Sequence, residues 1–343
     1  MSDTALYRKY RPDNFKEVIE QGDVVSVLSS EIKSGNIAHS YLFAGSRGTG
    51  KTTVARIFAR EIGASANDIY EIDAASNRGI DDVREIRDGV NVLPFESKYK
   101  VYIIDEAHML TKEAWNAFLK TLEEPPAHAV FILATTEMDK VPETVVSRCQ
   151  VFAFKKPNQE ILKAVALATA KKEGAGLDPA GAELIALLGD GSFRDTHGVL
   201  QKVLSGAHDI KKITLEDVEK VTGAPKNTLV NNIVVALSEK DSAKGLEAIT
   251  TAVAANVDIK LFIKLILQKL RFVLLLRYAP NLAEKIKKDL TEADYELLQG
   301  IAAKKESHIS SATLSELLGA LDITSRSSIS HLPLELAFIK LTT

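Results

Sequence analysis

The stretch GSRGTGKTT, residues 45–53, decides the fold of this chain, and it follows the short apolar run 41–44. The spacing from Gly45 to the tripeptide 50–52 fits the phosphate-binding pattern of a glycine, four residues and Gly-Lys-Ser/Thr. A strand before this loop and a helix after it would point backbone N–H groups and the positive helix end at an anion. The stretch therefore predicts a nucleotide site.

Each position of the loop has an expected role. Gly45 permits the tight turn out of the strand, and Gly48 and Gly50 leave the backbone open to phosphate oxygens. Lys51 would reach the β- and γ-phosphates, and Thr52 would hold magnesium. The other expected nucleotide contacts in the loop are Ser46, Arg47, Thr49 and Thr53. The alternative is an ordinary glycine-rich turn, although this spacing with lysine and threonine is rare by chance.

Short β-rich runs alternate with helical stretches around this loop. Strands are expected at 40–44, 69–74, 100–105, 129–136 and 149–154. Helices are expected at 52–63, 83–90 and 112–124, the last with Trp115, Phe118, Leu119 and Leu122 along one buried side. Strands separated by helices require crossover connections, so we expect an α/β domain with a parallel sheet and helices on both faces.

The pattern changes after residue 157, where no further strand is predicted. Helices are expected from Asn158, from Pro179 and from the serine cap Ser192, and about five more follow a Gly-Ala-Pro break at 223–225. The sequence therefore predicts an α/β nucleotide-binding domain over 1–157, a small helical domain over 158–223 and an all-α bundle over 224–343.

Composition limits the classes of function. The chain has 343 residues with 46 acidic and 43 basic side chains, so contact with nucleic acid would have to come from a local face. One cysteine, Cys149, excludes internal disulfides and a cysteine-rich zinc module. The amino terminus lacks the apolar core of a signal peptide, which favours the cytoplasm. The most apolar segment, 261–276, is interrupted by three basic residues and predicts an amphipathic helix and no membrane span.

The run KVYIIDEAH, residues 100–108, supplies the acidic residues of the predicted nucleotide site. Asp105 would lie at the carboxyl edge of the sheet, where a magnesium-bound carboxylate is needed, and Glu106 could accept a proton from an attacking water. Two solvated carboxylates at a strand end are the alternative. His108 is expected to be packed or hydrogen-bonded and not a metal ligand. Thr136, at the end of another strand, could sense the γ-phosphate or could be present only for its strand propensity.

Two arginines have contrasting positions. Arg148 would lie at the end of a short helix begun near Pro142, where a positive charge suits the helix dipole without any further role. Arg194 falls in the first turn of a capped helix, where the dipole disfavours a cation by about 0.3–1 kcal/mol. A nearby anion such as a nucleotide phosphate would explain Arg194.

These motifs resemble, in their order, the gamma/tau subunits of bacterial DNA polymerase III clamp loaders. The resemblance is dense over residues 5–200 and thinner beyond, where PLELAFIKL at 333–341 looks like the final collar helix. The matching segments are LYRKYRPDNFKEVIEQ (6–21), GSRGTGKTT (45–53), EIDAASNRGIDDVREI (71–86), VYIIDEAHMLTKEAWNAFLKTLEEPP (101–126), FILATT (131–136), VVSRC (145–149) and GSFRD (191–195).

The resemblance implies an AAA+ ATPase, with a lid domain at 158–223 and a collar at 224–343, that uses ATP and Mg²⁺. It implies assembly with copies of itself and with delta- and delta-prime-type loader subunits, opening of the sliding clamp, and placement of the clamp on primed DNA. A non-hydrolysing stator subunit of the same loader, or another AAA+ remodeller of DNA, are the alternatives. The intact Lys51, Thr52, Asp105 and Glu106 favour the motor subunit.

The resemblance also implies residue roles. Arg148 looks like an arginine finger directed at ATP in a neighbouring subunit, a contribution typically worth about 10³–10⁵ in rate. Arg194 looks like the second sensor and Thr136 like the first. The segment that borders adenine in such proteins corresponds to Tyr7, Arg8, Arg11 and Pro12. Candidate contacts with the DNA phosphate backbone are Arg84, Arg78, Thr111 and Lys112.

The chain departs from the family pattern in several places. Only about ten residues join Glu61 to Glu71, where most relatives insert a four-cysteine zinc module, so no zinc is expected. Glu20 stands where the family usually has glycine, and 196–197 replaces small apolar residues. The sequence also ends after the collar, so the long tail of the tau form is expected to be missing.

Overall fold

The computed structural model describes residues 4–77, 79–304 and 306–343. The chain divides into two compact units. The first unit comprises residues 1–162 and 189–198, and the second comprises 163–188 and 199–343. The first unit contains two hydrophobic cores, and the second unit contains a third.

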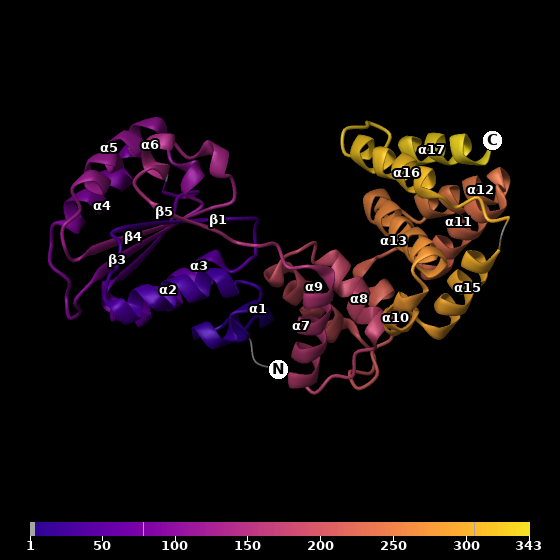
Figure 1. The fold of residues 1–343 in the computed structure, drawn as a ribbon, viewed down its shortest axis with the longest axis horizontal. Coiled ribbons are helices and arrows are strands. Elements are labelled where there is room, and N and C mark those ends of the chain that lie inside the picture. The colour runs from indigo at the N-terminus through magenta and orange to yellow at the C-terminus, as the bar shows by residue number, and fades with distance from the viewer. Residues whose placement is uncertain (1–3, 78, 305) are drawn as a thin grey trace. The chain divides into compact units, whose positions relative to one another are not determined.

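The first unit contains a five-stranded sheet of order β2-β3-β4-β1-β5 in which every described pair of neighbours is parallel (Figure 1). Its strands are β1 (Ser40–Ala44), β2 (Ile69–Asp73), β3 (Lys100–Asp105), β4 (Ala129–Thr135) and β5 (Gln150–Ala153). Each of the five predicted strands is confirmed, with ends that differ by at most two residues. The three central strands β1, β3 and β4 are buried almost throughout, which explains their near-continuous apolar runs, whereas the edge strands β2 and β5 are largely exposed.

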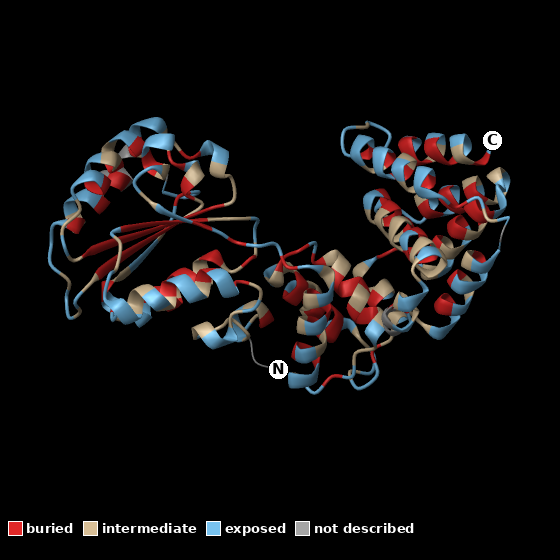
Figure 2. Ribbon diagram, viewed as in Figure 1, coloured by how far each residue is buried: buried red, intermediate tan, exposed pale blue. Residues whose placement is uncertain are grey.

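Helices cover both faces of the sheet, as the alternation predicted (Figure 1). Along β1, Tyr41 and Phe43 belong to a core with α2 (Gly22–Ser34) and α3 (Lys51–Glu61), while Leu42 belongs to a core on the other face. That second core includes α4 (Ile80–Val90), α5 (Lys112–Glu123) and α6 (Glu143–Val146). Figure 2 shows the buried side of these helices turned toward the sheet.

Helix α5 confirms the predicted apolar face. Trp115, Phe118 and Leu122 are buried, and Leu119 packs against the same core. The Phe118 ring meets Phe131 of β4 edge to face, with 5.2 Å between ring centroids. Burial of side chains of this size stabilises the fold by about 1.5–3 kcal/mol each, so this face fixes α5 on the sheet.

The loop between α4 and β3, residues 91–99, is held by hydrogen bonds to a buried carboxylate. The buried Asp68 carboxylate accepts the backbone N–H groups of Phe95 at 2.5 Å, Glu96 at 3.1 Å and Ser97 at 3.0 Å. These donors hold the pKa of Asp68 well below its usual range, against the opposing effect of burial. The loop nevertheless presents apolar side chains outward, with Val92, Leu93 and Phe95 exposed by 62%, 74% and 80%.

Helices make up the chain after the sheet (Figure 1). They are α7 (Gln159–Lys172), α8 (Pro179–Leu188), α9 (Phe193–Gly206), α10 (Leu215–Thr222), α11 (Asn227–Glu239), α12 (Ser242–Ala254), α13 (Ile259–Tyr278), α14 (Ala283–Asp289), α15 (Glu292–Ala303), α16 (Ser311–Thr324) and α17 (Leu332–Thr342). The predicted starts of α7, α8 and α9 are confirmed within one residue.

The helix count was predicted too low. Helix α10 was missed, although Thr214 and Asp217 form a capping box at its start. Among the described residues beyond 224, seven α-helices stand where about five were expected. One reason is that α11 ends at Lys240 in a left-handed conformation, with φ of 54°, where glycine is the usual signal.

Helix α13 lies at the centre of the second unit's core, which includes Phe262 and Ile266. Its Lys269 is only 6% exposed and pairs with Asp294 of α15 at 2.9 Å. The Lys269 Nζ also donates to the side-chain oxygens of Asn227 and Asn231 at 2.6 and 2.5 Å. One of the three basic interruptions of the predicted amphipathic helix is therefore buried. Within the described ranges, no helix has the length and apolar character needed to span a membrane.

Candidate nucleotide-binding site

The glycine loop connects the end of β1 to the start of α3, as predicted. Gly48 and Gly50 have φ of 74° and 101°, in the left-handed region that favours glycine. A Cβ on Gly50 would meet no atom within 4 Å, so its backbone conformation alone calls for glycine. A Cβ on Gly48 would collide with the side chain of Ser192. Gly48 thus also serves close packing against the start of α9, a role that the sequence did not reveal.

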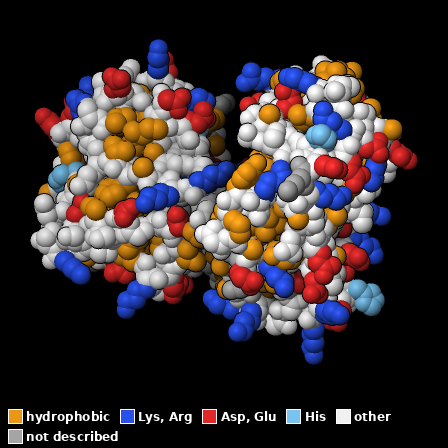
Figure 3. All heavy atoms as spheres, turned by 45° about the vertical axis from the view of Figure 1, so that its right-hand side comes forward, with side chains coloured by type: hydrophobic (Ala, Val, Ile, Leu, Met, Phe, Trp, Pro, Cys, Tyr) orange, Lys and Arg blue, Asp and Glu red, His pale blue; other side chains and the backbone are white. Residues whose placement is uncertain are grey.

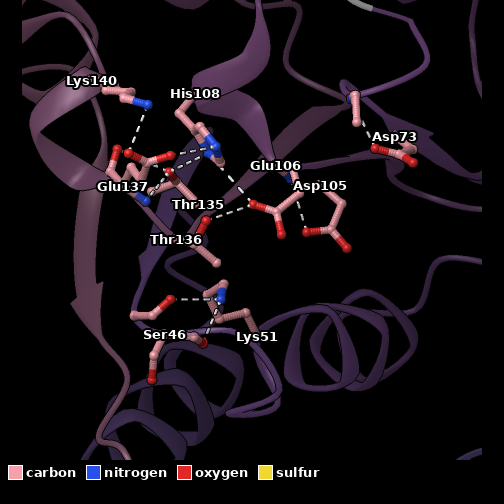
Figure 4. A network of polar contacts seen from close by, with 12 residues as sticks. Ser46, Lys51, Asp73, Asp105, Glu106, His108, Thr135, Thr136, Glu137 and Lys140 are labelled. Carbon is pink, nitrogen blue, oxygen red and sulfur yellow. Dashed lines mark hydrogen bonds and ion pairs between the residues drawn. The ribbon is translucent and has the colours of Figure 1, made fainter. Parts of the chain in front are cut away.

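Lys51 begins α3 and is only 5% exposed. Its Nζ donates to the backbone oxygens of Gly45 at 2.7 Å and Ser46 at 2.9 Å (Figure 4). Burial lowers the pKa of Lys51, and the carboxylates of Asp105 and Glu106 oppose that shift. The loop therefore has a cation at its centre whose direct hydrogen-bond partners are neutral carbonyl groups.

The other residues of the loop have mixed exposure. Ser46 and Arg47 are exposed, Thr53 is partly buried, and the hydroxyl of the buried Thr49 donates to the Ser46 oxygen at 2.9 Å. The Thr49 hydroxyl is thus used within the loop.

The two residues expected to hold magnesium lie together. The Thr52 Oγ1 donates to Asp105 Oδ2 at 2.8 Å, across 53 residues of sequence. Magnesium is usually bound through one or two carboxylates together with waters and phosphates, and not by a cage made only of protein. In the described part of the chain, no group of three or more His, Cys, Asp or Glu side chains could form such a cage. The Thr52 and Asp105 pair therefore fits magnesium that also contacts a nucleotide.

Glu106 is held in position at the edge of the sheet. It has φ of 48°, a left-handed conformation that costs a non-glycine residue about 1–3 kcal/mol. Its Oε2 accepts a hydrogen bond from the Thr136 hydroxyl at 2.9 Å and lies 3.5 Å from His108 Nδ1 (Figure 4). The His108 ring also lies 3.1 Å from the Thr135 hydroxyl and 3.3 Å from a Glu137 oxygen. His108 is thus hydrogen-bonded, as expected.

The amino-terminal segment forms a cluster of guanidinium groups beside Tyr7. The Arg194 guanidinium lies over the Tyr7 ring at 5.0 Å, and Arg8 Nε donates to the Tyr7 hydroxyl at 3.1 Å. The hydrogen bond from Arg8 lowers the pKa of Tyr7, and Arg194 adds to this effect. Burial lowers the pKa of Arg11, with further lowering by Arg56, Arg194 and Arg8. Like charges that destabilise one another in this way suit a bound anion.

The start of α9 is bonded directly to the glycine loop. The Phe193 N–H donates to the Gly48 oxygen at 3.0 Å, and the predicted cap is confirmed because Ser192 Oγ accepts the Asp195 N–H at 3.1 Å. Arg194 therefore extends from a turn that contacts the loop backbone. Pro12, the last residue expected near adenine, is partly buried.

Gln21 is a site residue that the sequence did not reveal. It is only 2% exposed, and its amide exchanges hydrogen bonds with the backbone of Lys155 at 2.8 and 3.0 Å. The same amide nitrogen lies 3.4 Å from the Thr49 oxygen of the glycine loop. Gln21 and Lys155 are 134 residues apart, so no local pattern could have paired them.

Arg148 lies after α6 at the surface. It makes an ion pair with Glu123 of α5 at 2.6 Å. None of the hydrogen bonds found for Arg148 among the described residues reaches the glycine loop, Asp105 or Glu106. Among the described residues, Arg148 is therefore not in hydrogen-bond contact with the other predicted site residues.

The candidate DNA contacts are only partly visible. Arg78 lies outside the described residues, as does the side chain of Arg84. The hydroxyl of Thr111 caps α5 by accepting the Ala114 N–H at 3.2 Å, and Lys112 is exposed. Figure 3 shows acidic and basic side chains interspersed over the visible face.

The residues that depart from the family pattern at 20, 196 and 197 all lie in the first unit. Glu20 adopts φ of 70°, the conformation for which glycine is suited. Thr196 is buried and donates to the Ser192 oxygen at 2.8 Å. The His197 ring stacks on Tyr10 with 6.2 Å between centroids, and burial lowers the pKa of His197.

The first unit has the fold of an AAA+ P-loop domain, with the glycine loop between the end of β1 and the start of α3. Structures of RuvB from Thermotoga maritima, described as a Holliday junction branch migration motor, share this fold with a TM-score of 0.53 and 21% identity, over 73% of this chain and 86% of theirs. The family model described as DNA polymerase III, delta subunit matches residues 64–158.

Relatives narrow the class further. The DNA polymerase III subunit gamma of Buchnera aphidicola is 36% identical over 260 residues, which cover 70% of this chain and 71% of that protein. The subunit tau of Bacillus subtilis is 38% identical over 85% of this chain, and the gamma/tau subunit of Mycobacterium tuberculosis is 36% identical over 92%. The chain belongs to the gamma/tau family of DNA polymerase III subunits. It matches 56% and 60% of the lengths of these last two relatives.

Proposed function

We propose that this chain is the ATP-hydrolysing motor subunit of a DNA sliding-clamp loader. The observation that carries the proposal is the Thr52–Asp105 pair, 2.8 Å apart and next to Lys51, in a chain of the gamma/tau family. A degraded site would be expected of a structural subunit, whereas Lys51, Thr52, Asp105 and Glu106 are all present in this chain.

The residues around the phosphates have separable tasks. Lys51 places a positive charge at the loop, where phosphate oxygens would replace its carbonyl partners. Magnesium, held by Thr52 and Asp105, would neutralise charge on the phosphates. Glu106 would accept the proton of the attacking water, and the Thr136 hydroxyl keeps the Glu106 carboxylate in place.

The remaining proposed roles concern nucleotide binding and partners. We infer that Tyr7, Arg8, Arg11 and Pro12 border the adenine, and that Arg194 contacts phosphate from the first turn of α9. Arg148 would act on ATP in a neighbouring subunit, either a copy of this chain or a delta-type partner. The assembly would act on the sliding clamp and on the phosphate backbone of primed DNA. This chain would use no zinc.

Three functional parts follow from this role: a nucleotide-binding domain over 1–157, a lid over 158–223 and a collar over 224–343. A replication subunit of this kind would work in the cytoplasm.

Two alternatives remain distinct from the motor. A stator subunit would donate Arg148 without hydrolysing ATP, and the intact Lys51 and Glu106 favour the motor over it. Another AAA+ remodeller of DNA shares the fold, and family membership favours the clamp loader over it.

Steady-state ATP turnover distinguishes these readings. The chain is assayed alone, and then with the sliding clamp, the other loader subunits and primed DNA. We expect low turnover alone and strong stimulation in the full mixture, with a loss of about 10³–10⁵-fold in Arg148→Ala. No turnover with every component present would favour the stator, and stimulation by branched DNA without the clamp would favour another remodeller.

A further inference from the structure

The side chain of Arg148 is held at both ends of its guanidinium group. Its Nη2 donates to Glu123 Oε1 at 2.6 Å, and its Nη1 donates to the Thr144 backbone oxygen at 2.6 Å. A longer contact of 3.4 Å joins Nη1 to the Ser147 hydroxyl. Long side chains at a protein surface ordinarily sample many rotamers, so an exposed arginine fixed by these partners is unusual.

The backbone of Arg148 is fixed as well. Its carbonyl oxygen accepts the hydroxyl of Ser40, a buried residue at the start of β1, at 2.6 Å. Its N–H donates to the Val145 oxygen at 3.0 Å. The Arg148 backbone is therefore attached to the sheet, and its side chain is attached to α5 and α6.

Glu123 occupies a position that needs an explanation. It lies in the last turn of α5, where the helix dipole disfavours a negative charge. The next residue, Glu124, is also acidic and exposed, and among the described contacts its carboxylate has no ion pair. The pair with Arg148 explains the acid at 123 and leaves Glu124 as a natural comparison.

The contacts leave part of the guanidinium available. Arginine has five N–H donors, and the three contacts above use only three of them. The remaining donors can face a phosphate from another subunit while Glu123 and Thr144 keep their bonds. An arginine ordered before assembly does not lose its rotamer freedom at the transition state.

We propose that Glu123 is a positioning residue, which fixes Arg148 so that its remaining donors meet the phosphates of a nucleotide bound in the neighbouring subunit. The inference rests on the proposed function. Glu123 touches no phosphate itself and acts only through Arg148. Its contribution is therefore expected in the rate of hydrolysis at the neighbour's site, and not in nucleotide binding by its own subunit.

The test compares Glu123→Ala with Glu124→Ala and Arg148→Ala in the loader assembled with its partner subunits, sliding clamp and primed DNA. Glu123→Ala should lower kcat for ATP about threefold to tenfold, the effect of ordering one long side chain, without raising KM. Glu124→Ala should match the wild type. Glu123→Gln, which keeps an acceptor but loses the charge, should fall between the wild type and Glu123→Ala.

Two further measurements separate positioning from a general structural role. Removal of an acid from the end of α5 should leave the melting temperature of the chain unchanged or slightly higher. In the Arg148→Ala background, Glu123→Ala should have no further effect on kcat, because Glu123 acts only through the Arg148 side chain. A lower melting temperature, or an equal effect in both backgrounds, would overturn the proposal.

The failure of this inference differs from the failure of the proposed function. If Arg148→Ala abolishes stimulated turnover and Glu123→Ala matches the wild type, the positioning role is wrong and the motor function stands. Faster turnover in Glu123→Ala would mean that Glu123 restrains Arg148, which also overturns positioning. If the wild-type loader shows no stimulated turnover, both proposals fail.

Discussion

Two of the buried lysines, Lys51 in the first unit and Lys269 in the second, have opposite electrostatic environments. Lys51 is 5% exposed and Lys269 is 6% exposed, and burial lowers the pKa of both. Lys269 pairs directly with Asp294, whereas the hydrogen bonds of Lys51 go to neutral carbonyl oxygens. A buried charge with a close counter-ion supports the fold, while one without it suits a ligand of opposite charge. The comparison favours a structural role for Lys269 and is consistent with the proposed phosphate-binding role of Lys51.

The largest expected effect breaks the pair in the second unit. Lys269→Ala leaves Asp294 buried without a counter-ion and should lower the free energy of unfolding by about 3–5 kcal/mol. Urea unfolding followed by circular dichroism measures the loss, with the exposed Lys260→Ala on the same helix as the control. The chain's one tryptophan, Trp115, lies in the first unit, so its fluorescence transition should move little. Equal stability of Lys269→Ala and Lys260→Ala would contradict the structural assignment.

The opposite outcome is expected for Lys51→Met. Without an ion pair to lose, the fold should keep its stability, while turnover in the assembled loader should fall about 100- to 1,000-fold because phosphate loses a positioned cation. Steady-state ATP turnover of the assembled loader and the Trp115 fluorescence transition in urea measure the two effects. The exposed Lys33→Met in α2 serves as a matched control. A destabilised Lys51→Met protein with normal turnover would reverse the comparison.

The ion pair of the second unit also predicts a pH dependence. Burial opposes the charge of Asp294, but Lys269 and the two asparagine donors lower its pKa below the usual value of about 3.9. A lowered carboxyl pKa adds stability that is present above about pH 4 and is lost as the pH falls through the folded-state pKa. The acid side of the stability profile should therefore be flatter in Asp294→Asn.

Glu219 is the control for this profile. Burial raises the pKa of Glu219, so its contribution to stability changes with pH in the direction opposite to that of Asp294. The partly buried Glu219 carboxylate gains a proton as the pH falls, and this protonation favours the folded state in acid. Glu219→Gln should therefore steepen the acid side of the profile. An identical profile in the wild type and Asp294→Asn would argue against the ion pair.

The smallest expected effect tests how much backbone strain near the glycine loop changes the stability of the first unit, compared with the effects of charge. Glu20 adopts a left-handed conformation next to Gln21, and glycine relieves such a conformation. Glu20→Gly should raise the stability of the first unit by about 0.5–1 kcal/mol, which Trp115 fluorescence would report as a higher midpoint in urea. Affinity for Mg-ATP should stay the same. An unchanged or lower midpoint would show that the strain at Glu20 is offset elsewhere.

The site was predicted from sequence where its chemistry is local. The glycine loop, the acids after β3 and the cap of α9 each occupy a few adjacent residues, and a parallel sheet brings the carboxyl ends of its strands to one edge. Thr52 and Asp105 could therefore be expected together although they are 53 positions apart in the sequence.

Contacts without a local pattern escaped prediction. Gln21 meets Lys155 across 134 residues, and Lys269 meets Asp294 through the packing of separate helices. Lys269 could not be told from a solvent-facing interruption of an apolar helix, because its neighbours in sequence are the same in both cases. Helix α10 is different, because its capping box of Thr214 and Asp217 is a local pattern that the sequence does contain.

The loop 91–99, which is bonded to Asp68, combines exposed side chains with hydrogen-bonded backbone amides. Phe95 is 80% exposed, yet its N–H and those of the next two residues donate to one buried carboxylate. Exchange of these amides with deuterated solvent requires the Asp68 bonds to open first. The segment should therefore exchange slowly, and a protease that prefers aromatic residues should cut it slowly despite the accessible ring.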